Sequence, residues 1–341
     1  MQTSKKCALW GIAAIALLAI AASGKAWAAQ SSGDASRPAT QGSNSSRPEL
    51  NLEIEIPNVE DDALHAKVPG ANDPWPEVNL NVVVLSKQGA PQTVDVSGFQ
   101  LFEDKAERPL HFRGSADSPV SLGLLIDSSH SMEKRGPAIS ALVTTIVKAL
   151  PAGSEAMAVL FDEEAYLDLP FTPASEIDYA FLDRVNAHGG TALNDAVVVA
   201  EKYFATHARY ARRAMILLSD GGDNASKSDL GDILPSLQWP GAPTFYSFHI
   251  PDSQASGADA RFGRIAMEIL AKEGGGVAFT PKEKDFASAA ARLADMIRSQ
   301  YVLHFTAADP ARDGKAHKLE VRLPIKDVQI HALPVYYAPA N

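Results

Sequence analysis

Hydrophobic residues in the middle of the chain occur in continuous runs, at residues 122–126, 156–161, 214–218 and 245–250. Strands that are apolar on both faces are typical of a parallel sheet covered by helices on each side. Stretches with helical period predict helices at about residues 137–150, 175–185, 192–206, 260–273 and 285–299. This alternation of strands and helices predicts a doubly wound α/β domain with a mostly parallel sheet over residues 114–299.

A period-two pattern flanks this region on both sides. Upstream it covers residues 78–84, 99–101 and 110–113, and downstream it covers residues 301–305 and 319–323. Such alternation suits strands with one face on a core. Because short strands need partners to cover their edges, we expect residues 78–113 and 300–337 to form one small antiparallel β domain, with the α/β domain inserted into it. The alternative is two unrelated β extensions.

The N-terminus has the pattern of a secretory signal peptide over residues 1–28. Lys5 and Lys6 form a basic start, residues 8–22 are apolar, and residues 26–28 form a small-x-small cleavage site. About fifteen apolar residues are too few to cross a bilayer core, which needs roughly twenty, so cleavage is favoured over a membrane anchor. We therefore expect a secreted or periplasmic protein with no stable membrane insertion after signal removal.

Composition changes this picture in two ways. Residues 29–77 carry a polar first part and four prolines in the second part, at positions 57, 69, 74 and 76, which predicts a flexible or irregular tether. Loss of residues 1–28 removes Lys5, Lys6 and Lys25 and takes the formal charge from −10 to −13. An acidic protein of this kind is not expected to bind nucleic acid.

Three residues that suit a metal ion directly follow the apolar run at residues 122–126: Asp127, Ser129 and Ser131. The carboxyl end of a central strand is the edge at which open α/β sheets bind their ligands. One carboxylate and two hydroxyls are hard oxygen ligands, which suit Mg²⁺ or Mn²⁺ better than zinc, because zinc prefers nitrogen and sulfur. The spacing therefore favours a hard cation.

Two further segments fit the same edge of the sheet. Thr191 lies in the Gly-Gly-Thr-Ala-Leu segment at residues 189–193, which opens a predicted helix, and Asp220 follows the run at residues 214–218. They add a hydroxyl and a second carboxylate. Each residue also has a plain structural interpretation, with Thr191 as a helix N-cap, Asp220 as a turn residue, and the serines as loop hydroxyls.

The three segments, Asp-x-Ser-x-Ser, Gly-Gly-Thr-Ala-Leu and Leu-Leu-Ser-Asp-Gly, resemble the motifs of the von Willebrand factor type A (VWA) domain, over about residues 120–299. The resemblance implies a VWA, Rossmann-like fold with a metal-ion-dependent adhesion site (MIDAS) that binds Mg²⁺, with Mn²⁺ and Ca²⁺ as alternatives. It also implies that a partner protein contributes a carboxylate to the metal. The flanks resemble a bacterial subfamily of exported VWA-related proteins common in Acidobacteria.

In such a site, the resemblance implies that Ser129, Ser131 and Thr191 contact the metal, and that Asp127 and Asp220 hold it directly or through water. His130 departs from the family pattern, in which a small residue such as Gly is common, and its side chain would either shield the metal or contact the partner. The binding function needs no catalytic acid or base of its own, and the chain is therefore expected not to be an enzyme.

The main alternative is a Mg²⁺-dependent phosphohydrolase of the haloacid dehalogenase-like type, in which Asp127 would be the nucleophile. That chemistry needs a second acid two residues on, where this chain has Ser129, and a missing proton-transfer group removes a factor of roughly 10²–10⁴ in rate. A third alternative is a structural α/β domain with a degenerate metal site.

Overall fold

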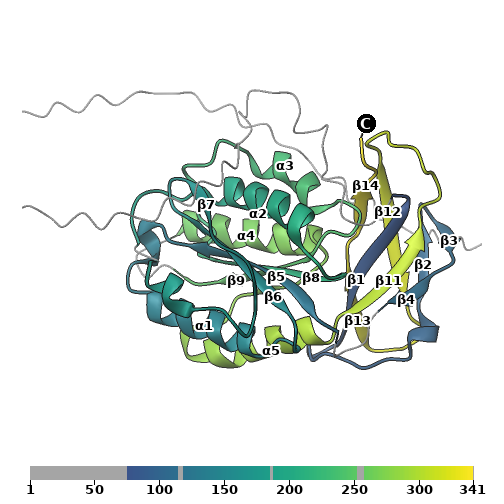
Figure 1. Cartoon of the computed structure of the whole chain (residues 1–341), viewed down its shortest axis with the longest axis horizontal. Helices are drawn as coiled ribbons and strands as arrows, with labels where there is room; N and C mark the ends of the chain where they lie inside the picture. The colour runs from purple at the N-terminus through teal and green to yellow at the C-terminus, as the bar shows by residue number, and fades with distance from the viewer. Residues whose placement is uncertain (1–74, 114–117, 185–186, 252–256, 341) are drawn as a thin grey trace, which may run out of the picture. The chain divides into compact units, whose positions relative to one another are not determined.

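Six strands form the central sheet, in the order β10-β9-β8-β5-β6-β7 (Figure 1). Neighbouring strands are parallel except for β7, which runs antiparallel to β6. The strands are β5 (Val120–Asp127), β6 (Glu155–Phe161), β7 (Ala165–Pro173), β8 (Arg212–Ser219), β9 (Thr244–His249) and β10 (Ala278–Phe279). This computed structural model describes residues 75–113, 118–184, 187–251 and 257–340, so the predicted signal peptide and the predicted tether up to residue 74 lie outside the described residues.

Helices cover both faces of this sheet, which confirms the predicted doubly wound α/β architecture. One face carries α1 and α5, and the other carries α2, α3 and α4 (Figure 1). Their bounds are α1 (Gly136–Lys148), α2 (Leu193–His207), α3 (Leu230–Ile233), α4 (Ala258–Glu273) and α5 (Phe286–Arg298). Short 3-10 helices lie at Val96–Gly98, His130–Met132, Tyr179–Arg184, Leu234–Leu237 and Glu283–Asp285.

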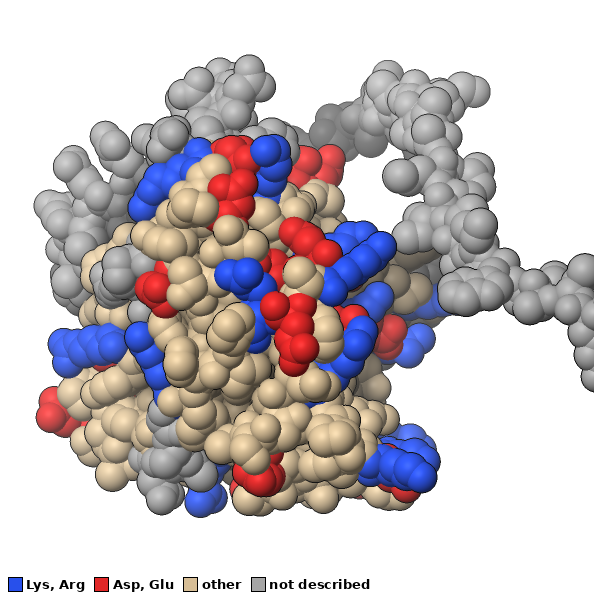
Figure 2. Space-filling model, turned by 90° about the vertical axis from the view of Figure 1, so that its right-hand side faces the viewer, with Lys and Arg blue, Asp and Glu red and all other residues tan. Residues whose placement is uncertain are grey.

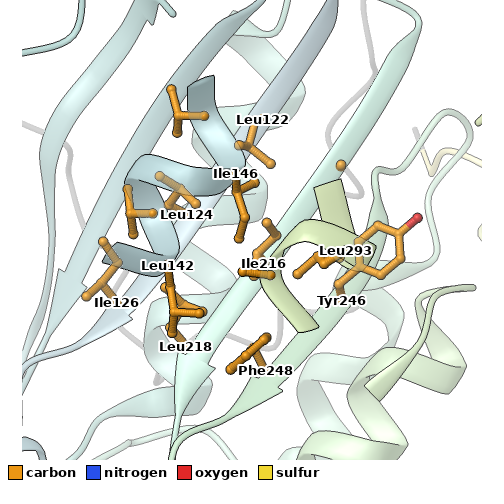
Figure 3. Close-up of a cluster of buried hydrophobic side chains, with 14 of the residues drawn as sticks. Leu122, Leu124, Ile126, Leu142, Ile146, Ile216, Leu218, Tyr246, Phe248 and Leu293 are labelled. Atoms are coloured by element: carbon orange, nitrogen blue, oxygen red, sulfur yellow. The ribbon is translucent and has the colours of Figure 1, made fainter. Parts of the chain in front are cut away.

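The apolar runs bury side chains on both faces of the sheet. Figure 3 shows the α1 and α5 face, where Leu124 of β5, Ile216 of β8 and Phe248 of β9 meet Leu142 of α1 and Leu293 of α5. All of these side chains are almost inaccessible to solvent. Full burial of one such side chain stabilises the fold by about 1.5–3 kcal/mol. This core therefore holds the strands in place, and with them the loops that follow their carboxyl ends.

Two further four-stranded antiparallel sheets, β13-β1-β11-β4 and β14-β12-β2-β3, form from the two flanks of the α/β region. The upstream flank provides β1 (Glu77–Ser86), β2 (Gln100–Glu103), β3 (Ala106–Arg108) and β4 (His111–Arg113), and the downstream flank provides β11 (Tyr301–Thr306), β12 (Ala316–Arg322), β13 (Val328–Ala332) and β14 (Val335–Tyr337). β1 pairs with β11 and β13, and β2 pairs with β12. The flanks therefore complete one another, and the alternative of two unrelated extensions is wrong.

The structure corrects two details of the sequence prediction. The helix predicted at residues 175–185 is only the short 3-10 helix Tyr179–Arg184, and the Asp178 side chain accepts a hydrogen bond from the Ala180 N–H at 3.0 Å. Such a local bond competes with α-helical pairing. β1 was expected to bury one face, but both are buried, because Val83 and Leu85 pack into the α/β core while its other apolar side chains face the flanking sheets.

Candidate metal site

Two serine hydroxyls converge on the carboxylate of Asp127, the last residue of β5. Ser129 Oγ donates a hydrogen bond to Asp127 Oδ1 and Ser219 Oγ donates one to Oδ2, both at 2.5 Å. Ser129 Oγ also lies 3.1 Å from Ser131 Oγ. Because β5 and β8 are parallel neighbours, their carboxyl ends meet at one edge, and the Asp127 carboxylate joins the loop after β5 to the end of β8.

The third predicted segment is tied to both of these loops. The His130 N–H donates to the Gly189 carbonyl at 3.3 Å, which joins the loop after β5 to the segment before α2. The Thr191 N–H donates to Asn224 Oδ1 at 2.8 Å, and the Asn224 N–H donates to the Thr191 carbonyl at 3.0 Å. The structure thus brings together all three segments that the sequence assigned to one edge.

Close backbone packing fixes the loop that carries Asp220. Gly221 has φ +86°, and a Cβ atom there would lie 2.2 Å from the Gly263 carbonyl oxygen of α4. A Cβ on Gly263 would lie 2.8 Å from the Asp220 carbonyl oxygen. Asp220 Oδ1 accepts a hydrogen bond from the Gly222 N–H at 2.9 Å, as expected of a turn residue. Only glycine at both 221 and 263 allows this approach.

The electrostatics of the edge oppose two ionised carboxylates without a cation. Asp127 is fully buried, and burial raises its pKa to about 6, while the hydrogen bonds from Ser129 and Ser219 act in the opposite direction. The nearby charge of Asp220 raises the pKa of Asp127 further. A cation between the two carboxylates would remove this repulsion.

His249 is a functional candidate that the sequence reasoning missed. It ends β9 and pairs in register with Ser219, the residue before Asp220. Burial lowers the pKa of His249, the charge of Asp220 raises it, and that of Arg264 lowers it. The sequence placed residue 249 inside an apolar run and so assigned it to a strand, although its position at the strand's carboxyl end could have marked it.

The donor set at this edge fits a hard divalent cation. Among the described residues, no three His, Cys, Asp or Glu side chains gather closely enough to hold a metal, so a bound ion would depend on hydroxyl ligands. The carboxylates of Asp127 and Asp220 and the hydroxyls of Ser129 and Ser131 are oxygen ligands of the kind that Mg²⁺ and Mn²⁺ prefer, and Thr191 is tied to this edge by its backbone. Asp127 is fully buried, and the charge of Asp220 repels its ionised carboxylate. A divalent cation bound here would neutralise both carboxylates.

Neighbouring residues have roles that separate them from the candidate ligands. Ala192, not Thr191, occupies the N-cap of α2, so the N-cap interpretation of Thr191 is wrong. Asp223 instead holds the start of this helix, because its Oδ2 accepts the Asn194 N–H at 2.9 Å. Asn224 positions Thr191 through the bonds described above. Asp223 and Asn224 therefore position the backbone around Thr191 and the start of α2 and are not candidate ligands.

Residues 122–222 match the family profile described as the von Willebrand factor type A domain. The chain contains a VWA domain. The matched segment begins in β5 and ends just after Asp220, so it includes all three loops of the site. No curated protein matches the chain in sequence.

Several solved structures match this chain at low sequence identity. A von Willebrand factor type A protein from Catenulispora acidiphila is 14% identical, with 79% of this chain and 75% of that chain covered and a TM-score of 0.46. An aerotolerance-related membrane protein from Bacteroides fragilis is 17% identical, with 52% and 98% covered and a TM-score of 0.39. Proximal thread matrix protein 1 from the mussel byssus, described with a zinc-occupied MIDAS motif, is 15% identical, with 57% and 49% covered and a TM-score of 0.43.

The arrangement around Asp127 in the VWA domain does not suit the phosphohydrolase alternative. The residue two positions on, Ser129, donates a hydrogen bond from its hydroxyl to Asp127, and a serine there cannot act as a general acid at neutral pH.

His130, the departure from the family pattern, is exposed and lies between Ser129 and Ser131 in the sequence. The resemblance of the flanks to an exported bacterial subfamily stays a prediction.

Proposed function

We propose that this protein is an exported, non-catalytic binding module whose VWA domain holds a divalent cation, Mg²⁺ first, and uses it to bind an acidic group of a partner protein. The proposed ligands are Asp127, Ser129, Ser131, Thr191 and Asp220. The proposal depends above all on one observation, the convergence of the Ser129 and Ser219 hydroxyls on the buried carboxylate of Asp127 beside Asp220.

The residues divide the work of such a site between them. Asp127 orients the Ser129 hydroxyl, and through it Ser131, so that their oxygens face the ion while Asp127 itself acts directly or through water. Thr191 and Asp220 close the site from the other two loops. The bound ion supplies positive charge and, because three of the protein's ligands are neutral hydroxyls, retains affinity for a carboxylate from outside.

Surface charge supports a protein partner rather than nucleic acid. On the face in Figure 2, formed by the two flanks, Lys and Arg side chains are interspersed with Asp and Glu. A basic patch of one sign, which nucleic acid binding requires, is not seen on that face. The formal net charge of −10 points the same way.

The proposed location is outside the cytoplasm, either secreted or periplasmic, on the basis of the predicted signal peptide at residues 1–28. Of the helices that the structure describes, none has the length and apolar character needed to cross a membrane. The domain boundaries, 114–299 for the VWA domain within a β domain of residues 78–113 and 300–337, are part of the same proposal.

Calorimetric titration of the purified protein with Mg²⁺ and Mn²⁺ tests the proposal. We expect one binding site per chain in the wild type and its loss in Asp127→Ala, because that change removes the central carboxylate without touching the apolar core. Glu320→Gln is the matched control, since it removes one exposed negative charge from β12. Circular dichroism of each variant checks that the fold survives.

Two outcomes would contradict the proposal. Equal Mg²⁺ affinity in the wild type and in folded Asp127→Ala would show that the ion binds elsewhere. Hydrolysis of a phosphomonoester that depends on both Mg²⁺ and Asp127 would show an enzyme instead of a binding module.

A further inference from the structure

Helix α4 holds an exposed aromatic side chain next to the candidate metal site. Phe262 is 68% exposed, more than any other large hydrophobic residue in the part of the chain that the structure describes. It directly precedes Gly263, whose backbone packs against Gly221 and the Asp220 carbonyl. Consecutive Cα atoms are about 3.8 Å apart, so the backbone of Phe262 lies close to the loop that carries Asp220.

Basic side chains flank this aromatic ring in the sequence of α4. Arg261 and Arg264 are both exposed, and the charge of Arg264 lowers the pKa of His249, which pairs with Ser219 next to Asp220. Arg264 Nη1 donates to Glu268 Oε1 at 3.3 Å, and both side chains are half-exposed. An exposed pair of this kind contributes little and exchanges readily for another carboxylate.

We infer that Phe262, Arg261 and Arg264 form a second contact region beside the metal site, for an acidic peptide segment of the partner with a large apolar side chain close to the metal-bound carboxylate. This inference rests on the proposed function. Aromatic and arginine side chains dominate the binding free energy of protein interfaces. The positive charges of the ion and of the two arginines select a segment with more than one acidic residue.

The spacing of the recognised groups follows from the reach of a peptide. An extended chain advances about 3.3–3.6 Å per residue, so a side chain that contacts Phe262 should belong to a residue close in sequence to the one that binds the metal. The expected segment therefore combines an Asp or Glu, a neighbouring Leu, Ile, Phe or Tyr, and a further acid. A single exposed hydrophobic residue is common on protein surfaces. Phe262 is proposed as a contact for the partner because it lies close to the loop that carries Asp220.

Selection from a random twelve-residue peptide library tests the inference. The library is displayed on phage, bound to the immobilised full-length protein in Mg²⁺ and eluted with EDTA. Parallel selections use Phe262→Ser and the matched control Phe112→Ser, which removes a 39% exposed phenylalanine from β4 in the flanking sheets. Eluted peptides should combine acidic and large apolar residues on the wild type and on Phe112→Ser, and should lose the apolar preference on Phe262→Ser.

A synthetic copy of the most enriched peptide then gives the size of the effect. We expect Phe262→Ser to weaken its binding about tenfold and Arg264→Gln to weaken it a few-fold, with Mg²⁺ affinity unchanged in both variants. EDTA-eluted peptides with acids but no apolar preference, or a preference that persists on Phe262→Ser, would overturn the inference and leave the metal-dependent function standing. If EDTA releases no enriched peptide, the proposed function fails and this inference fails with it.

Discussion

Two buried carboxylic acids in the VWA domain have very different surroundings. Asp127, at the carboxyl edge of the sheet, accepts a hydroxyl hydrogen bond on each oxygen. Glu201, on α2, accepts only one, from Trp239 Nε1 at 2.9 Å, and its Oε1 has no hydrogen-bond partner among the described residues. Burial raises the pKa of Asp127 to about 6 and that of Glu201 to about 8.

The difference shows what separates a binding group from a structural one of equal burial. Around Asp127 the polar partners come from a loop and from the carboxyl end of β8, and the carboxylate of Asp220 lies close by, so a cation can take part. Around Glu201 the neighbours are the Trp239 ring and Arg213, whose guanidinium carbon lies 5.6 Å from the centre of that ring. The Trp239 hydrogen bond and the Arg213 charge lower the pKa of Glu201, but burial outweighs them and keeps Glu201 mostly protonated near pH 7, so burial alone does not make a site.

The largest effect should come from Gly221→Ala, which disturbs the edge and leaves the surroundings of Glu201 intact. Its Cβ would lie 2.2 Å from the Gly263 carbonyl oxygen, at a residue with φ +86°. We expect a loss of about 4 kcal/mol in the free energy of unfolding and the loss of Mg²⁺ binding. Urea unfolding and calorimetry measure both quantities.

Gly136→Ala is the matched control for that change, because a Cβ at this first residue of α1 meets nothing within 4 Å. It should alter the unfolding free energy by less than about 1 kcal/mol. Similar stability of the two alanine variants would mean that the contact between Gly221 and Gly263 is looser than described.

The next effect concerns pH and Glu201→Gln. The folded-state pKa of Glu201, about 8, lies above its ordinary value of 4.5, so Glu201 keeps its proton to a higher pH in the folded state than in the unfolded state. Stability from this group is complete below about pH 4.5 and falls as pH rises to about 8. Glu201→Gln should remove this fall, and its free energy of unfolding at pH 9 should exceed that of the wild type by a few kcal/mol.

Urea unfolding at pH 5, 7 and 9 measures this prediction. Glu176→Gln, an exposed position just after β7, should leave the pH profile of stability as in the wild type. A wild-type profile that is flat from pH 5 to 9 would show that Glu201 ionises without cost, and the contrast with Asp127 would then disappear.

A third effect separates the two acids by their response to metal. Mg²⁺ at about 100 times its Kd should stabilise the wild type by about 2–3 kcal/mol. Asp127→Asn should gain nothing from Mg²⁺, and in EDTA at pH 8 it should melt no lower than the wild type, because the amide keeps the shape of the carboxylate without its charge. Thermal melts with and without Mg²⁺ decide this, and a Mg²⁺-induced rise in the Tm of Asp127→Asn would contradict it.

Much of this site was predictable because its information is local. Asp127, Ser129 and Ser131 follow an apolar run at fixed spacing, and parallel pairing of β5 with β8 brings Ser219 and Asp220 beside them. The long buried strands β5, β6, β8 and β9 were predictable for the same reason. Short strands such as β3 and β10 contain too few residues to show any period.

The remaining features depend on contacts between distant segments. Gly263 lies within a helical pattern, and only the position of α4 against residue 221 reveals its role. Glu201 also lies within a predicted helix, and its burial comes from Trp239, 38 residues away in sequence. Trp239 belongs to the cluster of buried residues formed mainly by the two flanks, which no local pattern in the helix could indicate.

The smallest and most discriminating effect compares Ser129→Ala with Ser219→Ala. Both serines donate to Asp127 at 2.5 Å, one to each oxygen, so each variant should lose about 1 kcal/mol of stability in EDTA. Only Ser129 is a proposed ligand, with its oxygen 3.1 Å from Ser131 Oγ, whereas Ser219 Oγ also accepts the Gly221 N–H at 2.9 Å. Ser129→Ala should therefore weaken Mg²⁺ binding about tenfold or more, and Ser219→Ala only a few-fold. Calorimetric titration of the two variants measures this ratio. Equal losses would mean that Ser129 acts only by orienting Asp127, and that the ion is held by the carboxylates and the remaining hydroxyls.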